Sequence, residues 1–70
     1  MKTKFAYVGY ELPQLIKSGV ETSLIVDGYI HMKEGQPIIF LKKNRVVSSI
    51  KIDLDAGLVT IFIDDVQKFS

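Results

Sequence analysis

Residues Thr22 to Asp64 read TSLIVDGYIHMKEGQPIIFLKKNRVVSSIKIDLDAGLVTIFID, and this stretch decides the fold. β-Branched residues occur in it in short alternating runs, and turn signals such as Asp27-Gly28 and Glu34-Gly35 separate the runs. Alternation of apolar and polar residues is typical of strands that bury one face. The stretch therefore predicts a mainly β domain (α+β at most), a small antiparallel meander or barrel-like roll of about five to six strands.

Three local signals predict where these strands turn or end. Asp27-Gly28 suits a two-residue type I′ hairpin loop, because both central residues of that turn need φ > 0. Such a loop would place Val26 opposite Tyr29. Pro37 has no N–H to donate to a ladder, so we expect it at the start of a strand or on an edge strand. Lys43-Asn44 predicts the next turn, with Asn44 in the left-handed conformation.

The last hairpin, Val46 to Ile63, allows two registers. A two-residue loop at Ala56-Gly57 places the even-numbered apolar residues of the first strand (Ile50, Ile52 and Leu54) on one face with Val59, Ile61 and Ile63. A three-residue loop with a bulge at Gly57 pairs them instead with Leu58, Thr60 and Phe62, and it suits Ala56 better because alanine disfavours φ > 0. In both registers the final strand is apolar on both faces. We therefore expect it to be central in the sheet or covered by a partner.

The N-terminal region predicts a strand and then a short helix. Lys4–Tyr10 is rich in strand-forming residues. From residue 12 to residue 18 the apolar spacing becomes helical, with Pro13 near the first helical position and Gly19 where a C′ glycine belongs. A helix of one to two turns is unstable alone. We therefore expect its apolar face to pack on the sheet.

Size and composition limit the class of protein. The chain has 70 residues, so we expect one domain spanning residues 1–70. It has no cysteine, which excludes disulfides and thiolate metal sites. Its N-terminus lacks the long apolar core of a signal peptide, so we expect a cytoplasmic protein without membrane contact. Hydrophobic residues make up 47% of this short chain, which raises the prospect of self-association.

The best polar candidate for a binding site is a basic hairpin. Lys42, Lys43 and Arg45 lie close together in the sequence, with Lys51 further along the next strand. Cations on a hairpin can contact a phosphate backbone and release its counterions. The four residues predict nucleic-acid binding as an alternative function. Solvated hairpins are often basic for another reason, because edge lysines block aggregation.

Nothing in the sequence indicates an enzyme, a cofactor or a metal site. Asp53 and Asp55 lie two residues apart on a predicted strand, without the loop of alternating ligands that holds a hard cation. His31 is the only histidine, and one histidine without cysteine does not make an ordinary zinc site. We predict no catalytic residue, no metal ligand, no cofactor and no small-molecule substrate.

The leading prediction is a non-enzymatic interaction module. It would self-associate as a homo-oligomer or dock on a protein partner through exposed strand edges and apolar surface. Tyr10, Phe62 and Phe69 are the predicted interface residues, because aromatic side chains are favoured interface anchors. Tyr10 is the one for which we most expect exposure. Free-standing chains this short often serve as phage, plasmid or regulatory accessory proteins, and we expect that class here.

The stretch KEGQPIIFLKKNRVVSSIKI, residues 33–52, resembles part of the trp RNA-binding attenuation protein family, small β proteins that form rings. Lys51 matches a lysine that contacts RNA in that family, but Asp53 stands where the family has arginine. The resemblance covers less than a third of the chain, needs an inserted residue and leaves the helix unexplained. No functional residue is therefore carried over from it.

Overall fold

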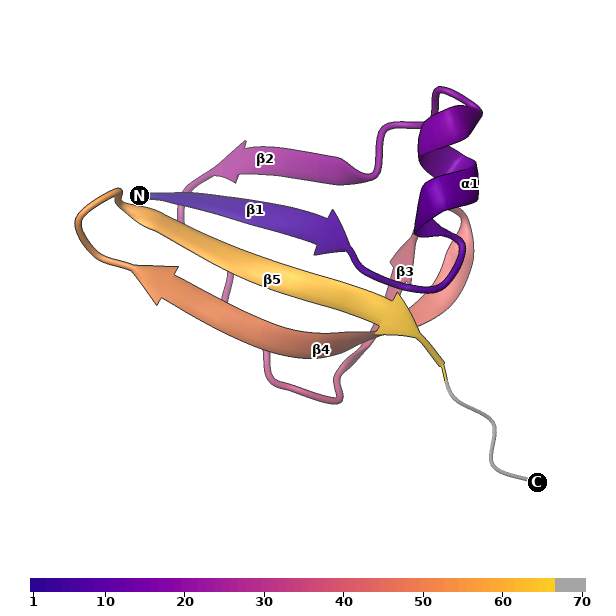
Figure 1. Cartoon of the computed structure of the whole chain (residues 1–70). Helices are drawn as coiled ribbons and strands as arrows, with labels where there is room; N and C mark the ends of the chain where they lie inside the picture. Colours follow the sequence, from indigo (N-terminus) through magenta and orange to yellow (C-terminus); the bar gives the residue numbers. More distant parts are fainter. Residues whose placement is uncertain (67–70) are drawn as a thin grey trace.

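The computed structural model describes residues 1–66, and it confirms a mainly β fold with one short helix (Figure 1). Its elements, in chain order, are β1 (Lys2–Tyr7), α1 (Leu12–Lys17), β2 (Ser23–Asp27), β3 (Pro37–Phe40), β4 (Lys43–Asp53) and β5 (Leu58–Asp65). The strands form one curled sheet, a half-barrel whose two edge strands are not paired with each other.

The strand order is β2-β1-β5-β4-β3, and β5 is central as the sequence predicts. The pairs β1–β2, β3–β4 and β4–β5 are antiparallel, whereas β1 and β5 run parallel. The sheet is therefore not a simple meander, because the first strand is inserted beside the last. On the concave face of β5, Val59, Ile61 and Ile63 are buried, whereas Leu58, Thr60 and Phe62 on its convex face are half-buried.

The core lies on the concave face of the sheet. Alternate residues of β1 and β5 point into it, and Phe5, Ile61 and Ile63 are buried there. Val47 and Val59 complete the buried cluster, against which the half-buried side chains of Val26, Met32, Ile38, Phe40 and Ile50 pack. Each fully buried aliphatic side chain stabilises the fold by about 1.5–3 kcal/mol. Met32 belongs to the connection between β2 and β3, so this connection contributes to the core.

The predicted hairpin at Asp27-Gly28 is wrong. Val26 pairs with Thr3 of β1, and residues 29–33 form no strand. Thr3 Oγ1 donates to the carbonyl of Gly28 at 2.7 Å and accepts from the N–H of Ile30 at 3.1 Å, which directs the chain away from β2. Gly28 has φ +91°, but Asp27 does not have positive φ, so the type I′ turn is not formed.

The next turn lies at Leu41-Lys42, two residues before the predicted position at Lys43-Asn44. Leu41 and Lys42 have φ values of 52° and 65°, as the central residues of a type I′ turn require. Phe40 pairs with Lys43 across this turn. Tertiary packing imposes this register, because it brings Ile38 opposite Arg45 on the concave face.

Neither predicted loop joins β4 to β5. The connection is a four-residue turn, residues 54–57, in which the N–H of Ala56 donates to Asp53 Oδ1 at 3.0 Å. Ile52 pairs with Val59 and Ile50 with Ile61. The same apolar residues therefore share a face as in the predicted two-residue loop, but each residue of β4 pairs two positions earlier on β5 than that loop would give. Leu54 consequently lies in the turn and is 78% exposed.

The helix ends as the sequence predicts. Gly19 has φ +77°, its N–H donates to the carbonyl of Ile16, and the N–H of Val20 donates to that of Leu15, which together form a Schellman motif. No residue of α1 is buried, and Ile16 is 60% exposed. The predicted apolar face of the helix is therefore not fully covered, because Ile16 points to solvent. Leu12 and Leu15 are half-buried, and hydrogen bonds from Ser18, Gly19 and Val20 to helix carbonyls close its C-terminal end.

Candidate interaction surface

The outer edge of β2 is a row of backbone groups without a partner strand in the described part of the chain. The N–H of Tyr7 donates to the carbonyl of Thr22, and the N–H of Gly28 donates to that of Met1. Because hydrogen-bonding direction alternates along an antiparallel strand, even-numbered residues of β2 point their backbone groups at β1. Ser23, Ile25 and Asp27 therefore point three N–H and three C=O groups outward.

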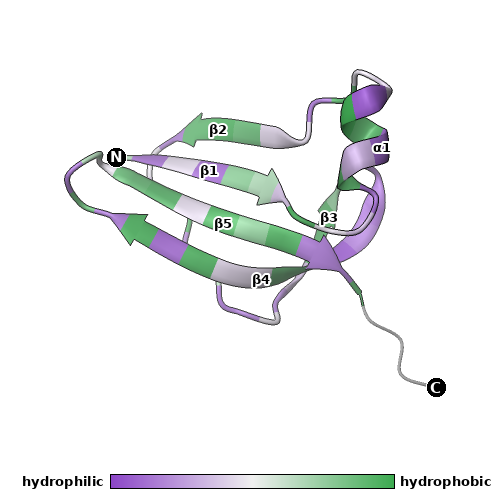
Figure 2. Ribbon diagram, viewed as in Figure 1, coloured by the Kyte–Doolittle hydropathy of each residue, from purple (hydrophilic) through white to green (hydrophobic). Residues whose placement is uncertain are grey.

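β2 also exposes apolar side chains on both of its faces. Leu24 lies on the concave face beside Phe5 and is 53% exposed, whereas Ile25 lies on the convex face and is 55% exposed. Figure 2 shows this edge strand as hydrophobic over most of its length. Soluble proteins usually protect such an edge with lysine, proline or a bulge. β2 contains none of these and only one charged residue, Asp27.

The opposite edge of the sheet, β3, is protected. The N–H of Val47 donates to the carbonyl of Gln36, so the same alternation points Pro37 and Ile39 outward. Pro37 has no N–H, and Ile39 is left as the one outward donor of β3. This confirms the prediction that Pro37 lies at a strand start and on an edge strand. Of the two edges, β2 is the one suited to accept another strand.

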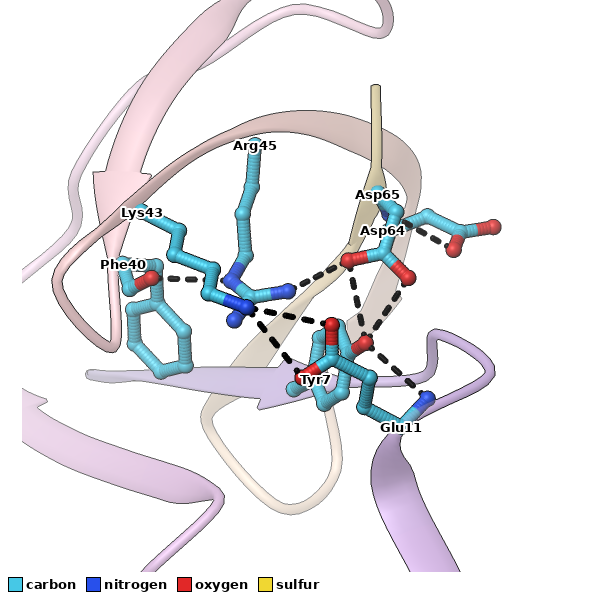
Figure 3. A network of polar contacts seen from close by, with 7 residues as sticks. All are labelled: Tyr7, Glu11, Phe40, Lys43, Arg45, Asp64 and Asp65. Atoms are coloured by element: carbon cyan, nitrogen blue, oxygen red, sulfur yellow. Dashed lines mark hydrogen bonds and ion pairs between the residues drawn. The ribbon is translucent and has the colours of Figure 1, made fainter. Parts of the chain in front are cut away.

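A polar network crosses the end of the half-barrel where β1, β4 and β5 meet (Figure 3). The guanidinium of Arg45 forms an ion pair with Asp65, its Nε donates to the carbonyl of Phe40 at 2.8 Å, and its Cζ lies 4.3 Å from the centre of the Tyr7 ring. The Tyr7 hydroxyl donates to Asp65, with 2.8 Å to Oδ2. The network thus satisfies charged groups that the fold encloses.

A β-bulge explains why Arg45 points inward. The β4–β5 register shifts between Val47 and Ser49. Before the shift the inward residues of β4 are odd-numbered, Arg45 and Val47, and after it they are even-numbered, beginning with Ile50. Strict alternation counted back from Ile50 would have placed Arg45 outside. Sequence reasoning missed this network because a bulge carries no clear local signal.

Burial and hydrogen bonding shape the electrostatics of the network. Burial raises the pKa of the Tyr7 phenol above its ordinary value of 10.0, and the hydrogen bond to Asp65 raises it further. Beside the network, Lys43 Nζ lies 3.2 Å from Glu11 Oε1. Arg45 and Lys43 are therefore each paired with a carboxylate.

The structure separates the four predicted nucleic-acid-binding residues. Arg45 is 2% exposed and is held in the internal ion pair, so it presents no guanidinium at the surface. Lys43 pairs with Glu11, whereas Lys42 is exposed in the turn before β4. Lys51 is exposed on the convex face beside Thr60. They do not form one continuous basic surface.

The predicted interface residues also lie apart. Tyr10 is 82% exposed, as expected, and lines an open pocket of about 520 Å³ between the turn after β1 and the ends of β4 and β5. Phe62 is half-buried on the convex face beside Ala6 of β1 and does not line this pocket. Phe69 lies outside the described residues. The candidate interface is instead the edge strand β2, and the sequence feature that could have indicated it is the uncharged run Ser23–Val26 (SLIV).

Among residues 1–66, no three histidine or carboxylate side chains gather where a metal ion could bind. The same residues contain no helix of the length and apolar composition needed to cross a bilayer. Comparison with protein-family models, with curated proteins and with solved structures finds no match for this chain. The resemblance noted over residues 33–52 thus has no support from the family models.

Proposed function

We propose that this protein is a non-enzymatic interaction module that binds an extended protein segment by adding it to the outer edge of β2. One observation carries the proposal: β2 offers outward backbone donors and acceptors at Ser23, Ile25 and Asp27, and no described strand pairs with them. In strand addition the main-chain hydrogen bonds supply affinity, and alternate side chains supply specificity.

The side chains of β2 fit this mode of binding. An added strand would place alternate residues beside Leu24 on the concave face and beside Ile25 on the convex face. Apolar residues at both sets of positions would cover side chains that are more than half exposed in the free chain. The preferred partner is therefore a segment of five or so residues with β-branched or other apolar side chains on both faces.

Nucleic-acid binding through Lys42, Lys43, Arg45 and Lys51 is the less favoured function. Backbone phosphate binding needs several cations that can reach phosphates together. Arg45 is enclosed with Asp65, and Lys43 is paired with Glu11. Within the part of the chain that the structure describes, Lys42 and Lys51 remain the cations without a carboxylate partner among these four, and they lie on different parts of the surface, in the turn before β4 and on the convex face of β4.

Peptides selected from a random-peptide display library provide the test, with binding mapped by amide chemical shifts on the ¹⁵N-labelled chain. We expect selected peptides to shift the amides of Ser23, Ile25 and Asp27. Ile25→Pro removes an outward donor and should weaken binding at least about tenfold. Ile39→Pro, which removes the outward donor of β3, is the matched control and should leave affinity within about twofold. Peptides that bind elsewhere, or no selected peptides at a concentration where the chain is monomeric, would refute the proposal.

A further inference from the structure

We infer that the segment added to β2 is the β2 strand of a second copy, paired antiparallel about a twofold axis through Ile25. This inference rests on the proposed function and names its partner. A twofold interface requires a surface that is complementary to itself. The three outward residues of β2, Ser23, Ile25 and Asp27, meet this requirement because Ile25 lies at their centre.

The hydrogen-bonding pattern matches across this axis. Ile25 faces Ile25 of the partner subunit, and Ser23 faces the partner subunit's Asp27. Each of these residues points its backbone groups outward, so they form the hydrogen-bonded pairs of an antiparallel ladder. The pairing would satisfy about six backbone N–H and C=O bonds across the axis. The result is one continuous sheet built from two half-barrels.

The side chains are complementary in the same register. On the convex face the two Ile25 side chains meet. On the concave face Leu24 lies opposite the partner subunit's Val26, which extends the apolar interior of each half-barrel across the axis. Cross-strand apolar pairs of this kind are the unit that stabilises a sheet.

Charge favours this register over the two registers in which one β2 strand is shifted by two residues. The strand carries one charge, Asp27, which faces the uncharged Ser23 of the partner subunit and lies beside Lys2 of its own β1. A slip of two residues toward the N-terminus would oppose Asp27 to the partner subunit's Glu21, and like charges directly opposite are destabilising. A slip the other way would oppose Asp27 to Ile25 of the partner subunit and separate the two Ile25 side chains.

The twofold arrangement also closes. Pairing of β2 with β3 of another copy would be heterologous and would propagate into a fibre. Pro37 on the outer edge of β3 disfavours that contact because it removes a donor. The β2–β2 contact joins one five-residue strand from each subunit and is therefore small, so we expect a weak dimer that forms in a concentration-dependent way.

The natural chain lacks cysteine, so single cysteines can test the register. Ile25→Cys should form an intermolecular disulfide in a glutathione buffer, since hydrogen-bonded pairs have Cα atoms about 5.5 Å apart. Ile39→Cys, more exposed at 75% but on β3, is the control and should cross-link at least about fivefold more slowly. Ser23→Cys should cross-link to Asp27→Cys faster than to itself.

Sedimentation velocity over a concentration series gives the second readout. The unmodified chain and Ile39→Lys should dimerise alike, whereas Ile25→Lys should raise the dissociation constant at least about tenfold. A chain that stays monomeric at about 1 mM, or equal cross-linking of Ile25→Cys and Ile39→Cys, would overturn the inference. If the chain is monomeric but selected peptides still bind its β2 edge, the dimer inference fails and the proposed function stands. If neither dimerisation nor peptide binding is observed, both the inference and the proposed function fail.

Discussion

Arg45→Met removes the cation at the centre of the Tyr7–Arg45–Asp65 network and should strongly destabilise the fold. The Arg45 side chain is 2% exposed and that of Asp65 is 21% exposed. Methionine keeps much of the apolar length of arginine but provides no charge and no donor for the carbonyl of Phe40. The substitution therefore leaves a carboxylate and a carbonyl without their partner.

The magnitude follows from the surroundings of Asp65. Removing one partner of a fully buried ion pair destabilises a protein by about 3–5 kcal/mol. Asp65 keeps the hydrogen bond from the Tyr7 hydroxyl at 2.8 Å and some contact with water, so we expect the lower end of that range, about 3 kcal/mol. A domain of this size has a total stability of about 4–10 kcal/mol. Arg45→Met should therefore remove about 30% or more of it.

Urea denaturation followed by circular dichroism, at one fixed protein concentration, measures this loss. Lys43→Met is the matched control, because Lys43 is 60% exposed and its pair with Glu11 should contribute less than about 1 kcal/mol. Asp65→Ala completes a double-mutant cycle with Arg45→Met, in which we expect a coupling energy of about 2 kcal/mol. Equal effects of Arg45→Met and Lys43→Met, or additive effects in the cycle, would refute the reasoning.

Three further substitutions probe the same fold. Gly9→Ala should lower the free energy of unfolding by about 2 kcal/mol, because a Cβ there would overlap the hydroxyl of Tyr7 and the carboxylate of Asp65; unchanged urea midpoints would contradict this. Tyr7 has a raised pKa in the folded state, so it supports stability below pH 10, and this support is lost as pH rises through the folded pKa. Above pH 10 the melting temperature of Tyr7→Phe should therefore fall less steeply with pH than that of the unmodified chain. Parallel pH dependences of the two melting temperatures would contradict this expectation. Lys42 has φ 65°, a conformation that glycine adopts more readily than alanine. In urea titrations Lys42→Gly should therefore be more stable than Lys42→Ala by about 1 kcal/mol. The reverse order of stability would exclude strain at this turn.

Turns show where local reasoning from the sequence ends. Asp27-Gly28 is a strong hairpin signal, yet β2 pairs with β1 instead of with residues 29–33. A favourable turn is worth about 1 kcal/mol, whereas packing along β1 places β2 beside buried Phe5 and gives its backbone a full ladder. The larger tertiary gain decides the pairing. The Leu41-Lys42 turn accepts two strained residues for the same reason.

The predicted basic hairpin is separated by the fold because long-range strand pairing, which the sequence does not show, places its residues. The sequence shows Lys42, Lys43 and Arg45 as neighbours, but the bulge after Val47 turns Arg45 into the interior. Its partner Asp65 lies on the next strand, twenty residues along the chain. No spacing rule relates two residues that meet only through strand pairing. The candidate site on β2 was hidden for the same reason, since an edge exists only once the strand order is known.

The sequence by itself determined the properties that depend on near neighbours along the chain. These are the mainly β class, the short helix with its Gly19 end, the central position of the apolar β5, the edge position of Pro37 and the exposure of Tyr10. Period-two alternation and backbone restrictions act within a few residues, so they can be read directly. Only the tertiary structure decided which strand pairs with which, because pairing is a competition among burial, hydrogen bonding and chain closure over the whole molecule. That competition placed β1 beside β5, buried Arg45 and left β2 open at its outer edge.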